Sequence, residues 1–206
     1  LVTPEEGETM KQKRALAAAL MACGLALGGT VSAGTPSAEM LAYTCAGCHG
    51  TNGNSAGPAT PTIAGASSEY IMEAMQEYKS AERPSTIMTR IAKGYSEEEF
   101  KLMADFFAKQ SFVAGNQTVD AGKAAKGAKL HDKYCEKCHA EGGTSAEDDS
   151  GILAGQWTPY LHYAMEDFLS GKREMTKKMA KKVEKLQKKE GDAGLENLIH
   201  FYGSAK

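Results

Sequence analysis

The chain has 206 residues, of which 42% are hydrophobic and 24% are charged, and its formal net charge is −2. These values are ordinary for a globular protein with one large domain or two small ones. The slight excess of acidic residues argues against a nucleic-acid-binding protein.

The N-terminal residues predict an export signal. Residues 1–9 look like neither a signal nor a domain, and Met10 is the expected start. Residues 10–33 combine basic residues, an apolar run over 15–27 and small residues before a cleavage point after Ala33. This pattern is typical of a cleaved secretory signal, and the run is too short and too rich in glycine for stable membrane insertion.

One short pattern then occurs twice: Cys45-Ala-Gly-Cys48-His49 and Cys135-Glu-Lys-Cys138-His139. C-x-x-C-H is typical of c-type haem attachment. The two thiols of each motif can each add to a vinyl group of one porphyrin, and the histidine then lies under the iron as its proximal ligand. The sequence therefore predicts two covalently bound haem c groups.

Two other interpretations of the same motifs fit less well. A redox-active dithiol needs no adjacent histidine. A zinc site would require the two pairs of cysteines to converge, and it would leave both histidines without a role. The fifth cysteine, Cys23, lies in the signal, so the mature protein should contain no disulfide and no free thiol.

The mature chain shows an internal duplication. Cys45 and Cys135 are 90 residues apart, and several downstream stretches repeat at the same offset, as in 63–65 with 153–155 and 74–75 with 164–165. We therefore expect two domains, 34–115 and 116–206. The stretch 114–126, rich in Gly, Ala, Asn and Thr, is the candidate linker.

Both copies have helical patterns. Residues 69–80 and 159–170 carry apolar side chains at helical spacing, and 195–202 form another such stripe. Ser96 followed by three glutamates predicts a capping-box start for a helix that buries Phe100, Met103, Phe106 and Phe107. No stretch alternates with period two for long, so the fold class should be all-α.

Electron transfer favours a methionine as the second axial ligand of each iron, because thioether ligation raises the reduction potential. Met88 follows His49 by 39 residues, whereas Met72, Met75 and Met103 have the spacing of core residues. In the second copy Met175 and Met179 compete. The residues that follow favour Met179, which lies 40 residues after His139.

Three histidines outside the motifs and one run of basic residues are the remaining features of the second copy. We expect His131, His162 and His200 to be exposed or capping residues. Between Lys172 and Lys189 nine Lys or Arg face only two Glu, which indicates either a solvated helix face or a patch that steers an acidic partner toward the second haem.

The longer strings resemble a known family. The layout is similar to that of the class I dihaem cytochromes. Several stretches more closely resemble the cytochrome subunits of flavocytochrome c sulfide dehydrogenases: 45–51, 85–95, 129–139 and 152–160. The resemblance covers nearly all of residues 37–206 and implies two tandem class I cytochrome c domains.

The resemblance also implies a function. Such a subunit is no enzyme by itself; in the periplasm it takes electrons from a flavoprotein sulfide dehydrogenase subunit, which alone holds FAD, and passes them to a soluble cytochrome c. One alternative is a free-standing dihaem carrier of the c-four type that feeds a terminal oxidase. Another is a dihaem peroxidase, against which Met88 and Met179 argue because that enzyme needs an open iron site.

Overall fold

The computed structural model describes residues 34, 36–147 and 150–206. The expected signal, with Cys23, lies outside these residues. Residues Ser37–Lys206 form one compact unit. Every regular element in the described part of the chain is helical, as the sequence predicted.

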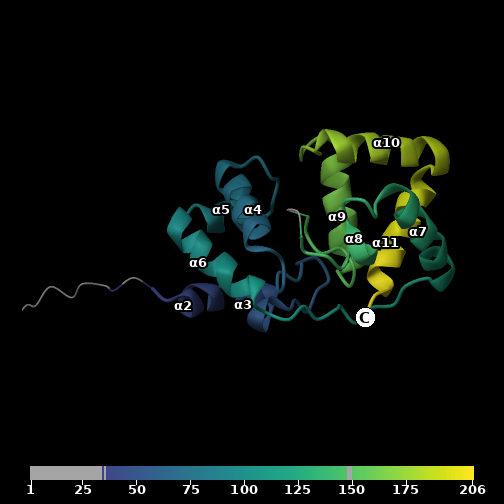
Figure 1. Cartoon of the computed structure of the whole chain (residues 1–206). Helices are drawn as coiled ribbons and strands as arrows, with labels where there is room; N and C mark the ends of the chain where they lie inside the picture. The colour runs from purple at the N-terminus through teal and green to yellow at the C-terminus, as the bar shows by residue number, and fades with distance from the viewer. Residues whose placement is uncertain (1–33, 35, 148–149) are drawn as a thin grey trace, which may run out of the picture. The chain divides into compact units, whose positions relative to one another are not determined.

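The first copy forms one group of helices, coloured purple to teal in Figure 1. Helices α4 and α6 pack against each other, α2 lies on α6, and α5 lies on α4. Phe100 and Ala104 of α6 are fully buried at the centre of this group. Its elements are α2 (Ala38–Tyr43), α3 (Ala46–His49), the 3-10 turn η1 (Thr51–Gly53), α4 (Ser68–Ser80), α5 (Met88–Ala92) and α6 (Glu97–Ala108).

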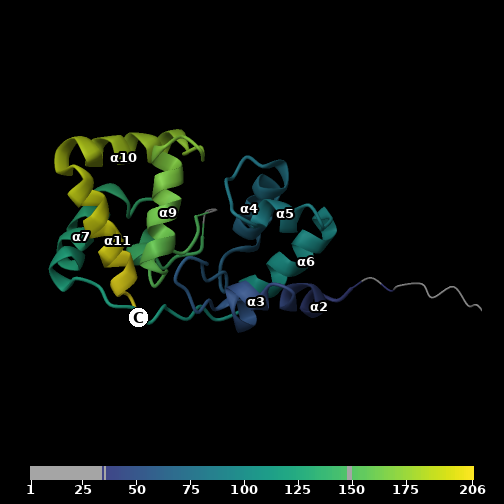
Figure 2. The ribbon, with the colours of Figure 1, turned by 180° about the vertical axis from the view of Figure 1, so that it is seen from behind.

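The second copy forms a second group, coloured green to yellow and shown from behind in Figure 2. Helices α7 and α11 make its main contact, with α9 and α10 packed on α11. Leu186, Leu198 and Tyr202 are buried in its core. Its elements are α7 (Ala121–Tyr134), α8 (Ala140–Gly143), α9 (Thr158–Leu169), α10 (Lys177–Glu190) and α11 (Asp192–Ser204).

The predicted capping box is confirmed. The Ser96 hydroxyl accepts a hydrogen bond from the backbone N–H of Glu99, and the Glu99 carboxylate accepts one from the N–H of Ser96. Two backbone donors that the first turn of a helix leaves unpaired are thereby satisfied. Of the four side chains expected to be buried, Phe106 is only half-buried.

The predicted linker was too long. Residues 121–126 belong to α7, whose first turn is capped by the Asp120 carboxylate accepting from the N–H of Lys123. Ala124 and Gly127 are buried, and Gly127 lies directly against the backbone of Asn197 in α11. Small residues here allow two helices to approach closely, whereas the sequence pattern suggested a structureless connection.

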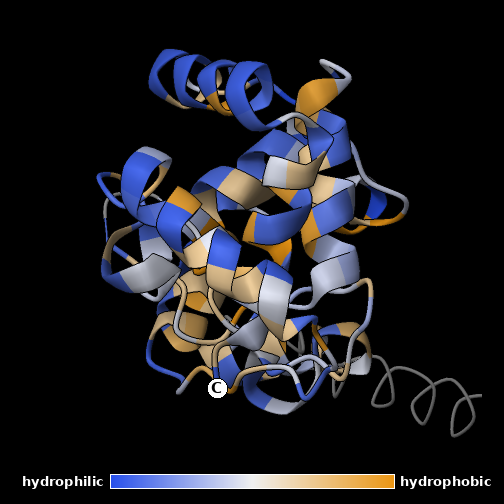
Figure 3. Ribbon diagram, turned by 90° about the vertical axis from the view of Figure 1, so that its right-hand side faces the viewer, coloured by the Kyte–Doolittle hydropathy of each residue, from blue (hydrophilic) through white to orange (hydrophobic). Residues whose placement is uncertain are grey.

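Helix α10 differs from the others in polarity. Figure 3 shows hydrophilic residues along nearly all of this helix, at the top of the view. Leu186 is its one fully buried residue. Among the described residues, no helix combines the length and the apolar character needed to cross a bilayer.

Candidate functional site

Both cysteine motifs form a tight turn directly after a helix. In the first copy the backbone N–H of His49 donates to the carbonyl of Cys45 at 2.9 Å, and in the second His139 donates to Cys135 at 3.0 Å. The first cysteine of each motif is half-buried and the second is exposed. Each turn thus presents two thiols and one imidazole together.

The four cysteines are not gathered at one point. Cys45 packs against the core of the first helical group, and Cys135 packs against the core of the second. Among the described residues, no three His, Cys, Asp or Glu side chains come together as a metal-ligand cluster. The two motifs are therefore separate sites, unlike the joint site that a zinc interpretation requires.

His49 is fixed in orientation by a backbone carbonyl. It is buried, and its Nδ1–H donates to the carbonyl of Pro61 at 2.9 Å. With the proton on Nδ1, the lone pair of Nε2 is free to bind iron, and the hydrogen bond fixes the ring and makes it more basic. Burial lowers the pKa of His49, which keeps the imidazole neutral near pH 7.

His139 is half-buried and lies in a different environment. Burial also lowers its pKa, and so does the charge of His131. Its Nδ1 has no hydrogen-bond partner among the described residues.

The structure separates packing methionines from the proposed ligands in the first copy. Met103 is buried in the core and Met75 packs against it, as expected. Met88 is half-buried at the first residue of α5. It lies outside both core clusters of the described residues, which leaves it available as a distal ligand.

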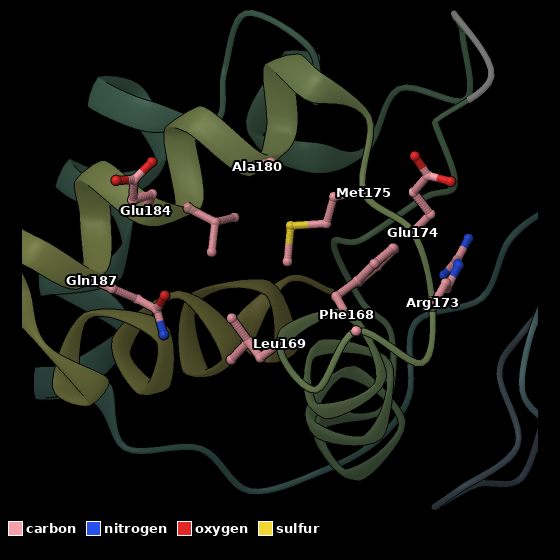
Figure 4. A pocket seen from close by; sticks show the side chains of 10 residues that line it. Phe168, Leu169, Arg173, Glu174, Met175, Ala180, Glu184 and Gln187 are labelled. Atoms are coloured by element: carbon pink, nitrogen blue, oxygen red, sulfur yellow. The ribbon is translucent and has the colours of Figure 1, made fainter.

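Met175 and Met179 point to different places in the second copy. Met175 lines a pocket of about 610 Å³ between the end of α9 and α10, and Figure 4 shows its side chain directed into that pocket beside Phe168 and Leu169. Met179 does not line this pocket. It shares a face of α10 with Leu186, seven residues on, and Leu186 belongs to the cluster on which Cys135 packs.

The two copies are joined by side chains of the second copy. The Gln156 amide is buried; its Oε1 accepts from the N–H of Thr62 at 3.1 Å, and its Nε2 donates to the carbonyl of Thr62 at 2.7 Å. The Trp157 indole N–H donates to the carbonyl of Ser55 at 3.1 Å.

A buried arginine lies near the same contact. Arg83 is 6% exposed, donates to the Tyr70 hydroxyl at 3.3 Å and lies 3.6 Å from the Glu77 carboxylate. Arg173, its equivalent 90 residues on, approaches the same carboxylate at 4.0 Å. Two guanidinium groups thus share one carboxylate, and Nη1 of Arg83 has no hydrogen-bond partner among the described residues.

A scan of protein families matches residues 37–110 to the family "Cytochrome c". Cytochrome c-554(548) of Halomonas halodenitrificans is 31% identical over 70 residues, which are 32% of this chain and 84% of that protein. The chain belongs to the cytochrome c family.

Two further relatives show how far the cytochrome resemblance extends. The cytochrome subunit of sulfide dehydrogenase from Chlorobaculum tepidum is 49% identical over 73 residues, which are 35% of this cytochrome and 66% of that subunit. The match therefore spans just under two thirds of the subunit. Cytochrome c4 of Azotobacter vinelandii is 29% identical over 178 residues, 78% of this chain and 84% of that one.

The fold is that of a dihaem cytochrome. Reduced recombinant cytochrome c4 from Pseudomonas stutzeri matches with a TM-score of 0.70 and 24% identity, over 84% of this chain and all of the other. The expected arrangement of two tandem class I cytochrome c domains is confirmed, and so are two covalently bound haems.

The side chains fit such a cofactor. Each motif offers two unpaired thiols for thioether bonds and a neutral imidazole for the iron. Nη1 of Arg83 forms an ion pair with Glu77 at 3.6 Å but no hydrogen bond among the described residues, so it can also serve an anionic group, and a haem carries two carboxylates at its edge. When bound, the haem supplies an iron that changes charge by one electron. The protein's part is to hold the ring, provide axial ligands and exclude water.

Sequence reasoning was wrong about His131. We expected an exposed or capping residue, but its side chain is fully buried. His162 is 48% exposed, and His200 accepts a hydrogen bond from the N–H of Asp120 at the start of α7, so the expectation is confirmed for these two.

Proposed function

We propose that this cytochrome is the electron-transfer subunit of a flavocytochrome c sulfide dehydrogenase located in the periplasm. It accepts electrons from a flavoprotein subunit and passes them through both haems to a soluble cytochrome c. The observation that carries the proposal is the 49% identity to a sulfide dehydrogenase cytochrome subunit.

We further propose which residues hold the haems. Cys45 and Cys48 attach the first, and Cys135 and Cys138 attach the second. The axial pairs are His49 with Met88, and His139 with Met179. The lowered pKa of both imidazoles and the position of Met179 on the face of α10 that carries Leu186 support this assignment.

Each half is small enough to be only marginally stable on an apolar core of its own. A haem held by the thiols of each motif would supply apolar surface that the side chains do not. Burial of that haem would exclude water from its iron. This protects the thioether and imidazole ligands from exchange, so the chain relays electrons and performs no bond chemistry.

A free-standing carrier of the c-four type is the second candidate. It is favoured by the similarity to cytochrome c4 of Azotobacter vinelandii, which aligns over 178 residues, or 78% of this chain. The two candidates differ in one respect that can be measured: only the first requires a tightly bound flavoprotein.

Purification of the native protein from its source under anaerobic conditions tests the proposal. We expect flavin in a one-to-one ratio with the cytochrome chain, and reduction of both haems on addition of sulfide. A dihaem protein that elutes without flavin and is not reduced by sulfide would favour the free-standing carrier.

A further inference from the structure

His131 lies at the centre of a hydrogen-bonded chain that links α11 to the second cysteine motif. Its Nδ1 lies 2.9 Å from the Tyr202 hydroxyl, and its Nε2 bonds to the Glu136 carboxylate. The carbonyl of His131 also accepts from the N–H groups of Cys135 and Glu136, at 2.8 and 2.9 Å. The imidazole has no exposed surface.

Glu136 lies inside the motif, between Cys135 and Cys138. Besides His131, its carboxylate accepts from the N–H of Glu141 at 3.1 Å and from the N–H of Gly142 at 3.2 Å. These bonds lower the pKa of Glu136, that with His131 contributing most, so the group is a carboxylate. One negative charge is thus held in place by three donors, even though the side chain is 43% exposed.

The protons of this chain can be assigned from the acceptors. A carboxylate can only accept, so Nε2 of His131 carries a proton and donates to Glu136. The other ring nitrogen, Nδ1, hydrogen-bonds to the Tyr202 hydroxyl, which can donate or accept. Both ring nitrogens of His131 are thus hydrogen-bonded, and the negative charge of the group lies on the Glu136 carboxylate.

The first copy has no such group. At the offset of 90 residues, His131 corresponds to Leu41 and Glu136 to Ala46. Tyr202 corresponds to Phe107, because the carbonyl of Phe107 accepts from Gly65 as that of Tyr202 accepts from Gly155. Leu41 and Phe107 are buried in the apolar core of the first copy. A polar relay therefore replaces apolar packing in one copy only.

We propose that Tyr202, His131 and Glu136 form a positioning relay that fixes a carboxylate at the second attachment motif and lowers the reduction potential of the second haem. The proposal rests on the attachment of a haem at Cys135 and Cys138. Ferric haem carries one more positive charge than ferrous haem, so a nearby fixed negative charge stabilises the oxidised form. The first haem lacks this effect.

The test replaces Glu136 by glutamine in the mature dihaem protein. The change keeps the size of the side chain and removes its charge. Glu141→Gln is the matched control, because Glu141 lies in the same turn with an exposed side chain that no described residue binds. A redox titration followed by absorption is fitted to two one-electron steps, and the mass of the intact protein counts the haems in each variant.

We expect Glu136→Gln to raise one of the two potentials and leave the other unchanged, while Glu141→Gln shifts neither. His131→Leu, which installs the first-copy residue, should raise the same potential, since it releases the carboxylate from its tether. If the relay has a purely structural role, Glu136→Gln and His131→Leu should have a lower melting temperature and both reduction potentials unchanged.

Three results would overturn the relay: no shift in Glu136→Gln, an equal shift in Glu141→Gln, or loss of one haem in Glu136→Gln, which would assign Glu136 to attachment instead. If His131→Leu does not fold, the potentials of Glu136→Gln still decide whether the carboxylate lowers the reduction potential. None of these outcomes bears on the flavoprotein partner, whose presence is tested by the flavin content of the native protein.

Discussion

At the scale of single residues, the second distal ligand is the assignment that needs a direct test. Met175 and Met179 are both half-buried, so exposure does not separate them. Their surroundings do, because Met175 faces a pocket at the end of α9 and Met179 shares a helix face with a core residue beside Cys135.

Leucine replaces a methionine with similar volume but no sulfur. We expect Met179→Leu and Met88→Leu each to remove about half of the near-infrared sulfur-to-iron absorption of the oxidised protein, whereas Met175→Leu retains all of it. The reverse result for Met175 and Met179 would assign the ligand to Met175.

The residues of the two motifs could be predicted because their chemistry is local: two thiols and an imidazole within five positions. His131 could not be. Its neighbours in sequence, Asp132 and Lys133, are charged, which suggests a solvated helix end. Its partners lie 5 and 71 positions away, and only the folded chain brings Tyr202 next to it.

At the scale of elements, the apolar stripes 69–80 and 159–170 predicted α4 and α9 within one residue of their observed bounds, whereas α11 begins three residues before the stripe 195–202. Helix α7 was missed over its first two turns because Ala and Gly fill them. Those small residues suggest a linker in sequence, but in the structure they are what allows α7 to lie against α11.

A substitution at Gly127 tests whether small residues are what allows α7 to lie against α11. A Cβ at this position would collide with the backbone carbonyl of Asn197, which cannot move aside as a side chain would. We expect Gly127→Ala to lower the free energy of unfolding by about 1–3 kcal/mol. Denaturant titration of the dihaem protein measures it.

Gly122→Ala in the first turn of the same helix is the control for Gly127→Ala. There an added Cβ meets only a side-chain oxygen of Asp120, at 3.2 Å. Alanine favours the helix over glycine by roughly 1 kcal/mol, so stability should stay the same or rise. A loss equal to that of Gly127→Ala would contradict close packing as the cause.

At the scale of the whole molecule, Gln156 joins the two copies through the main chain of Thr62. Removing its amide leaves a buried N–H and a buried carbonyl unpaired, which costs about 2–4 kcal/mol. We predict that Gln156→Ala splits chemical unfolding into two transitions, one for each copy.

The matched variant is Gln76→Ala, which removes an exposed amide from α4. It should change the free energy of unfolding by less than about 0.5 kcal/mol and leave a single transition. Unfolding of Gln156→Ala in one step at unchanged denaturant concentration would show that other contacts join the copies.

The lysines of α10 bear on the stability of the molecule and on its partners. In the described part of the chain, no lysine between 177 and 189 is paired with a carboxylate. Several lie four residues apart, an arrangement that weakens an isolated helix. The helix therefore carries a cost in stability that an acidic partner would offset, in keeping with a docking role.

Replacing Lys177, Lys178, Lys181 and Lys182 by glutamine should slow electron transfer to an acidic soluble cytochrome at low ionic strength. The difference should vanish near about 1 M salt, where charges are screened within about 3 Å. Stopped-flow measurement over a range of salt concentrations checks it, with Lys126→Gln/Lys129→Gln on α7 as the control. Equal rates for all proteins would leave α10 as a solvated face.

Gln156 and Trp157 are side chains of the second copy that bond to backbone groups of the first copy. Their equivalents 90 residues earlier, Ala66 and Ser67, have side chains too short to reach across in return. If residues 37–115 and 116–206 were produced as separate polypeptides, unlike fragments should therefore associate in preference to like ones. The duplicated gene would then have lost the ability to work as a homodimer of either half, and a permuted chain that begins with the second half should still assemble.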